Sequence, residues 1–248
     1  MEQKAFKEEE IPYGILEQFG LNQEMVEDLP MGPFENILAG RRSPVLPISF
    51  KAEDGRTISS RTRFMLIRQD DGTVDVLFAP QLEHSDIAQY SEEQKKQLKE
   101  GKAIVAPSPK DGISQCFVQI DPGTNQVLFI PTPVIGRNLR VLMDNHHLSS
   151  AEIQMIQEGE PMTFMEGDEM VTAGIDLTEK TGIRMQLGDS QKWANERNDG
   201  MESYNFGLYG CWIKDDNGEL RYIHEDDYTE EIWDIQKKVI AQNSGIKR

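Results

Sequence analysis

Apolar residues in the first 40 positions recur at helical spacing and are interrupted by residues that begin or end helices. Ile15 and Phe19 share one helical face, and Gly20 follows them where a left-handed cap would end the helix. Asn22 is placed to cap a second helix, and a third helix ends at Gly40. The pattern therefore predicts three short helices at the start of the chain.

After this segment the pattern changes to runs that are rich in β-branched and aromatic residues, which are typical of strands. Three such runs, Val45–Lys51, Thr57–Arg68 and Val74–Ala79, are separated by Asp-Gly pairs that favour tight turns. They predict a three-stranded antiparallel meander. The middle run shows little alternation, so we expect a central strand that is covered on both faces.

An internal repeat follows, with an offset of 58 residues between residues 91–105 and 149–163. Both copies open with a capping-box pair, Ser followed three positions later by Gln or Glu, and both close on a glycine ten residues after that Ser. The paired positions are Ser91 with Ser149, Leu98 with Ile156, and Gly101 with Gly159. Strand-like runs follow each copy, so the repeated unit is predicted to be one helix and a three-stranded meander.

The remaining segments are a linker, a loop, a hairpin and a helix. Residues 133–148 link the copies and are predicted to contain a short helix, whereas the polar residues 188–204 are predicted to be a loop or a boundary. The end of the chain is predicted to form a hairpin of Phe206–Ile213 with Leu220–Ile223, and then a helix from Tyr228 to Gln242 that Asp226 or Asp227 caps. Helical spacing predicts these buried residues: Tyr228, Ile232, Ile235, Val239 and Ile240.

These elements predict an α+β fold made of antiparallel meanders with short helices. It includes two helix–three-strand repeats and a C-terminal hairpin plus helix. We divide the chain into residues 1–88 (helices and meander), 89–132 (first repeat), 133–190 (linker and second repeat) and 191–248 (acidic hairpin and terminal helix).

Composition excludes several classes of protein. The chain has 248 residues and a net charge of −17, which disfavours direct nucleic-acid binding because that needs a basic face. No apolar run approaches the roughly 20 residues of a membrane span, so no membrane association is expected. The N-terminal residues lack the apolar core of a signal peptide, and two cysteines are too few for a disulfide framework. A cytoplasmic location is therefore expected.

The acidic excess is concentrated late in the chain. Residues 151–234 contain 21 acidic and 6 basic residues, whereas residues 41–68 contain 7 basic and 2 acidic residues. Such asymmetry is typical of an interaction surface, although most acidic proteins gain only solubility from it.

The histidines do not form a convincing metal site. His146 and His147 stand next to Asp144, but adjacent side chains on a helix or strand point in different directions and do not easily share one ion. The residues from His224 to Asp227 are better explained as the start of a helix.

No catalytic constellation is evident, and no cofactor is predicted. Cys116 and Cys211 lie in apolar strands, where a thiol usually packs as a small hydrophobic group. The chain also lacks a nucleophile elbow, a phosphate loop and a dinucleotide-binding glycine motif. We therefore expect a protein that is not an enzyme.

Two charged surfaces remain as candidate sites. A basic strand could contact phosphates, or it could simply pair with nearby acids; it comprises Arg56, Arg61, Arg63 and Arg68. An acidic surface could face a basic, nucleic-acid-binding protein, or only confer solubility. Its members are Glu158, Glu160, Glu166, Asp168, Glu169, Asp215, Asp216, Glu225, Asp226 and Asp227.

The N-terminal segment contains three short motifs: Ile11-Pro12-Tyr13, Leu16-Glu17-x-Phe19-Gly20-Leu21 and Ile37-Leu38-Ala39-Gly40-Arg41-Arg42-Ser43. With these motifs it resembles an uncharacterised domain family of Bacteroidetes conjugative mobile elements. The two capped repeats resemble a second uncharacterised domain that often follows the first. The resemblance covers residues 11–187 and implies modules that stand alone or are attached to DNA-handling proteins, including type IA topoisomerases. It implies no catalytic or binding residues.

Three hypotheses about function follow. The first is a non-catalytic cytoplasmic accessory protein of a mobile element, which acts by protein–protein contacts near DNA-processing machinery. The second is an acidic nucleic-acid mimic that inhibits a host DNA- or RNA-binding defence protein. The third is an enzyme whose active site is assembled from residues far apart in the sequence.

Overall fold

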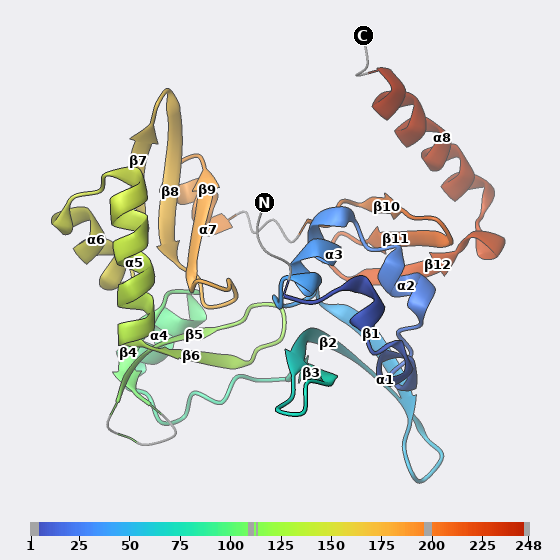
Figure 1. The fold of residues 1–248 in the computed structure, drawn as a ribbon, viewed down its shortest axis with the longest axis horizontal. Helices are drawn as coiled ribbons and strands as arrows, with labels where there is room; N and C mark the ends of the chain where they lie inside the picture. Colours follow the sequence, from blue (N-terminus) through green and yellow to red (C-terminus); the bar gives the residue numbers. More distant parts are fainter. Residues whose placement is uncertain (1–4, 109–111, 113, 196–199, 246–248) are drawn as a thin grey trace. The chain divides into compact units, whose positions relative to one another are not determined.

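The computed structural model describes residues 5–108, 112, 114–195 and 200–245. They belong to two compact units: unit 1 comprises residues 1–78 and 199–248, and unit 2 comprises residues 79–198. In the described part of the chain, the strands form four antiparallel sheets of three strands each, and every sheet keeps the order of the sequence. The predicted α+β fold of antiparallel meanders and short helices is confirmed (Figure 1).

Unit 1 combines elements from both ends of the chain. Its N-terminal elements are the 3₁₀ turn η1 (Glu8–Glu10), α1 (Tyr13–Gln18), α2 (Gln23–Glu27), α3 (Met31–Leu38), β1 (Leu46–Lys51), β2 (Thr57–Arg68) and β3 (Val74–Pro80). Its C-terminal elements are β10 (Tyr204–Phe206), β11 (Gly210–Lys214), β12 (Leu220–His224), the 3₁₀ turn η2 (Glu225–Asp227) and α8 (Glu230–Gly245).

The predicted cap between the first two helices is confirmed. Gly20 has a φ of +80°, and the Leu21 amide donates to the carbonyl of Leu16 at 3.1 Å, which is the Schellman arrangement. A side chain at Gly20 would lie 2.8 Å from the carbonyl oxygen of Ser49, so the close approach of β1 also requires glycine. Asn22 caps α2 as predicted, by accepting from the Met25 amide at 2.9 Å.

The first meander is also confirmed, with β2 in the centre of the sheet. Phe64 and Leu66 of this strand are buried, whereas Met65 and Ile67 are half-buried. The core beneath it contains Leu16 and Leu21, which are fully buried.

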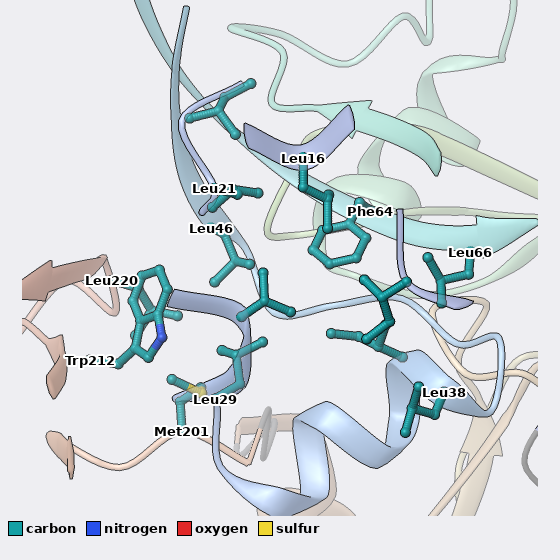
Figure 2. Packing of buried hydrophobic residues seen from close by; sticks show 14 of the residues in the cluster. Leu16, Leu21, Leu29, Leu38, Leu46, Phe64, Leu66, Met201, Trp212 and Leu220 are labelled. Carbon is teal, nitrogen blue, oxygen red and sulfur yellow. The ribbon is translucent and has the colours of Figure 1, made fainter. Parts of the chain in front are cut away.

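Residues from the far end of the chain complete the same core. Trp212 and Leu220 of the C-terminal hairpin pack with the N-terminal residues, together with Met201 (Figure 2). The indole N–H of Trp212 donates to the carbonyl of Met25 at 2.8 Å. The segment 191–248, which the sequence suggested as a separate part, thus contributes to the N-terminal core.

A buried carboxylate joins these two parts of unit 1. Asp28, at the end of α2, accepts from the amides of Leu208 at 2.6 Å and Tyr209 at 3.1 Å, and from the hydroxyl of Tyr222 at 2.6 Å. Gly207 packs so closely against this carboxylate that a side chain there would collide with it. Burial, and then the bond to Asp28, raise the pKa of Tyr222, so its hydroxyl remains a donor.

Unit 2 contains the two repeats. The first has α4 (Glu92–Lys99), β4 (Ile104–Pro107), β5 (Gln115–Ile120) and β6 (Val127–Pro131). The linker helix α5 (Thr132–His146) precedes the second, which has α6 (Ser150–Gln157), β7 (Met162–Glu166), β8 (Glu169–Ile175), β9 (Ile183–Leu187) and then α7 (Ser190–Asn195). The predicted unit of one helix followed by a three-stranded meander is confirmed in both copies.

The capping boxes of the repeat are confirmed as well. The side chains of Ser91 and Ser149 accept from the amides three positions later, and both helices are followed by a glycine with positive φ. Equivalent positions of the two copies contact one another: the Lys102 ammonium lies 3.0 Å from the Glu160 carboxylate, and both residues follow those glycines. Contacts between equivalent residues are the signature of pseudo-twofold packing.

A buried glutamine provides a second contact between equivalent positions. The side-chain carbonyl of Gln119 accepts from the amide of Leu177 at 2.8 Å, and its NH₂ group donates to the carbonyl of Gly101 at 2.9 Å. Gln119 is almost fully buried, and a buried polar side chain without hydrogen bonds would destabilise the fold. These two bonds satisfy its amide group.

Two predictions in unit 2 are wrong in length or type. The linker helix α5 has 15 residues, because Ile135, Leu139 and Leu142 form a buried stripe that extends it. Residues 188–204, which are predicted to be a loop or a boundary, contain α7, which the side chain of Asp189 caps by accepting from the Lys192 amide at 2.8 Å. The helix forms where its one large apolar residue, a buried tryptophan, packs on the second repeat. The division between the two units falls within this segment, and its residues 196–199 lie outside the described residues.

The terminal helix also differs from its prediction. Helix α8 starts at Glu230, and the side chain of Thr229 caps it by accepting from the Ile232 amide at 3.4 Å, whereas Asp226 and Asp227 lie in η2. Ile232 is buried as predicted, but Ile240 is 58 % exposed. The remaining predicted residues, Tyr228, Ile235 and Val239, are half-buried. The apolar stripe of α8 is therefore covered mainly at its N-terminal end.

We expect Asp28→Ala to lower the free energy of unfolding of unit 1 by about 3 kcal/mol, because buried donors would lose their acceptor. Urea unfolding followed by tryptophan fluorescence measures this loss. The exposed Asp226→Ala is the matched control and should change stability by less than about 0.5 kcal/mol. Equal effects of the two substitutions would show that Asp28 does not hold the segments together.

Ser91→Ala and Ser149→Ala should each destabilise unit 2 by about 1 kcal/mol, because each removes the cap of a helix in one repeat. Circular dichroism during urea unfolding reports the loss. Ser150→Ala, one position inside α6, is the control and should have little effect. A negligible effect of both cap substitutions would contradict the assignment of these boxes as structural signals.

Candidate functional site

The arginines of the predicted basic strand each have partners within unit 1. The Arg61 guanidinium lies 2.6 Å from the Glu219 carboxylate, and the Arg63 guanidinium donates to the carbonyl of Ser43 at 2.8 Å. Although both residues lie on one face of β2, they reach toward different neighbours. Arg61 thus pairs with a nearby acid, whereas Arg63 bonds to a backbone carbonyl.

The outer two arginines of this set are also paired. Arg56, just before β2, lies 2.6 Å from Asp54 in the preceding turn. Arg68 lies 3.0 Å from Glu10 and stacks over the ring of Phe6 with 5.2 Å to its centroid. A phosphate at any of these positions would have to compete with an existing carboxylate or aromatic partner.

The candidate acidic residues fall into two groups that belong to different units. In unit 1, Asp215 accepts from the amides of Asn217 and Glu219, so it shapes the hairpin turn beside Asp216. A second acidic cluster in unit 1 is the turn η2, which consists of Glu225, Asp226 and Asp227. In that turn His224 accepts from the Asp226 amide through Nδ1 at 3.2 Å, which is a cap at the start of a 3₁₀ turn.

A groove in unit 1 is lined by residues of both the predicted basic strand and the predicted acidic surface. It has a volume of about 610 Å³ and is lined by Arg61, Lys214, Asp215, Asp216 and Arg221, among others. Cations and carboxylates are mixed within it, so the groove presents no surface of a single sign. Its charges are therefore suited to internal pairing more than to binding a polyanion.

The other acidic group lies in the second repeat of unit 2. Glu158 accepts from the side chain of Gln154 at 2.9 Å, and Glu160 pairs with Lys102. The remaining three members, Glu166, Asp168 and Glu169, lie at the turn between β7 and β8. All three are exposed.

The tip of the β7–β8 hairpin is the strongest candidate site in unit 2. Met165 and Met170 are cross-strand partners and therefore share one face of the sheet, where they are 61 % and 46 % exposed. Glu166 and Glu169 are the next pair and point to the other face. We call Met165 to Met170 the hairpin tip. Its acids were predicted from the sequence as candidate site residues. Its methionines were not, although two apolar residues on either side of a glycine turn were a visible signal.

A histidine supports the hairpin tip from α5. His146 lies with Nδ1 at 3.0 Å from a Glu166 carboxylate oxygen, and its ring centroid lies 5.9 Å from that of Phe164. His147 has a φ of +54° and ends the helix, so the adjacent histidines have different surroundings. Among the residues that the structure describes, no group of three or more His, Cys, Asp or Glu could hold a metal ion.

Both thiols are buried. Burial raises the pKa of Cys211 to about 11, and Asp28 adds to the effect. Cys116 is 1 % exposed within the first sheet of unit 2. The interpretation of both residues as small core groups fits this burial.

None of the described helices is both long enough and apolar enough to cross a membrane.

Comparisons with known proteins give one family match. Residues 6–89 match a family described as a protein of unknown function (DUF4099). No curated protein matches the chain, and no solved structure matches it. The N-terminal resemblance to an uncharacterised domain thus has independent support over the three helices and the first meander. Trp212 and Leu220, which complete the core of that segment, lie outside the matched range.

The burial of both thiols predicts slow modification. At about pH 8 the native protein should react with a disulfide reagent far more slowly than the unfolded protein, because the thiolate is the reactive form and a raised pKa keeps Cys211 neutral. Reactivity of Cys211 should increase only as the pH approaches 11. Guanidinium-unfolded protein is the control. Rapid labelling of the native protein at about pH 8 would show that a thiol is accessible.

Proposed function

We propose that this protein is a non-catalytic accessory protein that binds a protein partner through the hairpin tip of unit 2. The observation that carries the proposal is the exposed Met165–Met170 pair at the end of a hairpin that also carries three carboxylates. Exposed apolar residues beside charged ones are typical of interaction surfaces, and methionine side chains adapt to differently shaped partners.

The chemistry of the tip indicates the kind of partner. Burial of the two methionines would supply apolar contact area, while Glu166, Asp168 and Glu169 would attract a basic surface and orient it. A partner with an apolar patch beside lysines or arginines fits both features. Proteins that bind nucleic acids carry such basic faces.

The resemblance supplies the cellular setting of the proposal. The domain families that the sequence resembles, from conjugative mobile elements, stand alone or are attached to DNA-handling proteins, including type IA topoisomerases. We extend this setting to the present chain: a cytoplasmic protein that acts near DNA-processing machinery of a mobile element. The match of residues 6–89 to an uncharacterised family is compatible with this proposal.

A second candidate function rests on charge alone. Residues 151–234 contain 21 acidic residues and 6 basic ones, so their carboxylates could occupy the nucleic-acid site of a host defence protein. Mimicry of this kind would depend mainly on charge, whereas the proposed contact also depends on the two methionines. Salt therefore separates the two functions, because screening weakens exposed charge pairs strongly.

The experiment compares two variants of the hairpin tip in capture from host lysate across a salt series. The apolar variant is Met165→Ser with Met170→Ser, and the charge variant is Glu166→Gln with Asp168→Asn and Glu169→Gln. The proposed function predicts that capture of a defined partner survives high salt and falls at least roughly tenfold in the apolar variant. Val134→Ser with Val141→Ser, at exposed positions of α5, is the matched control.

Mimicry predicts the opposite outcome. Capture would then be lost steeply as salt increases, DNA would compete for the partner, and only the charge variant would fail to bind. Capture that is indifferent to both sets of substitutions would exclude the hairpin tip from either function.

A further inference from the structure

A second groove lies in unit 1, along the outer side of strand β10. It has a volume of about 520 Å³ and is bordered by three elements: β10, the connection between α2 and α3, and the C-terminal half of α8. All three residues of the strand, Tyr204 to Phe206, line it, and so does Gly207, which follows the strand. Because successive side chains of a strand point to opposite faces, a groove that touches all of them runs along the edge of the strand.

This edge offers main-chain hydrogen-bonding groups. Within the described part of the chain, β10 is an edge strand of its sheet: β11 pairs with it on one side, and no strand pairs with it on the other. The Lys214 amide donates to the carbonyl of Ser203 at 2.9 Å, and the Gly207 amide donates to the carbonyl of Gly210 at 2.8 Å. Antiparallel pairing alternates, so the amide and carbonyl groups of Tyr204 and Phe206 point away from β11, toward the groove.

The walls on either side of the edge are apolar. Leu29 contributes from the α2–α3 connection, Met31 from the start of α3, and Val239 and Ile240 from α8. Met31 is 76 % exposed and Ile240 is 58 % exposed, which is unusual for large apolar residues that line a groove. An occupant with apolar side chains would remove both from water.

Carboxylates add charge to this groove. Glu27 and Glu202 line it together with the apolar residues, and no lysine, arginine or histidine is among the described lining residues. Asp28 also borders the groove, but it is committed to the loop after β10. An occupant with basic residues flanking an apolar centre would match this arrangement.

We propose that the groove binds an extended segment of a partner protein, with an apolar centre and basic flanks, as a fourth strand beside β10. This is β-strand addition, in which main-chain bonds supply affinity and the walls select the side chains. Tyr204 and Phe206 provide the main-chain bonds, and Val239 and Ile240 contact the apolar side chains. The site belongs to unit 1 and does not depend on the hairpin tip, so either can fail without the other.

The test uses the full chain and a defined probe, the capped peptide Lys-Lys-Val-Thr-Val-Lys-Lys. Nuclear magnetic resonance should show amide shifts concentrated at Tyr204 to Gly207 when the peptide is added. The same peptide with its central Val-Thr-Val N-methylated loses its main-chain donors and should bind at least roughly tenfold more weakly. Ile240→Lys should weaken binding of the unmodified peptide by a similar factor, because it adds charge to an apolar wall.

Ile58→Lys is the matched control, since Ile58 is an exposed isoleucine of unit 1 that does not line the groove. It should leave peptide affinity unchanged, and unperturbed spectra of both variants establish that they fold. Equal binding of the methylated peptide, shifts at other residues, or no binding to the wild-type chain would each overturn the proposal. Concentration-dependent shifts at β10 without peptide would instead assign the edge to a second copy of this chain.

Discussion

The buried carboxylate of Asp28 is the constraint on which the organisation of unit 1 depends. A carboxylate removed from water needs several donors, and Asp28 finds them in a loop and a tyrosine that lie 180 or more residues further along the chain. The requirement fixes the loop from Gly207 to Tyr209 against the end of α2. It therefore also fixes the preceding strand β10, whose open edge forms one wall of the groove. The hydrogen bonds of Asp28 therefore both stabilise the fold of unit 1 and position the strand beside the proposed binding site.

Unit 2 uses a different principle, the packing of two related copies. Each copy has one helix and one sheet, and residues at equivalent positions meet between them, as in the pairs Lys102–Glu160 and Gln119–Leu177. The copies differ in what they expose. The second copy carries the β7–β8 hairpin with its exposed methionines and acids, and this is the surface to which we assign partner binding.

An element could be predicted from the sequence wherever the residues that determine it lie close together in the chain. The cap at Gly20, the capping boxes at Ser91 and Ser149, and the strands of the first meander all depend on residues a few positions apart. The entry of Trp212 into the N-terminal core has no such local signal, because it depends on a surface formed by distant residues. The sequence likewise identified the candidate acidic residues but did not show which of them lie close together in space. The structure divides them between the two units. The groove beside β10 was missed entirely, since no single segment contains it.

If the two parts of unit 1 depend on each other for folding, they unfold as one cooperative unit. Native-state hydrogen exchange of the intact chain measures this, because the amides of one cooperative unit open with a common free energy. We expect the amides of Phe64 in β2 and Trp212 in β11 to exchange with the same opening free energy and the same denaturant dependence. Exchange of Trp212 through a separate, lower-energy opening, while Phe64 remains protected, would contradict this expectation.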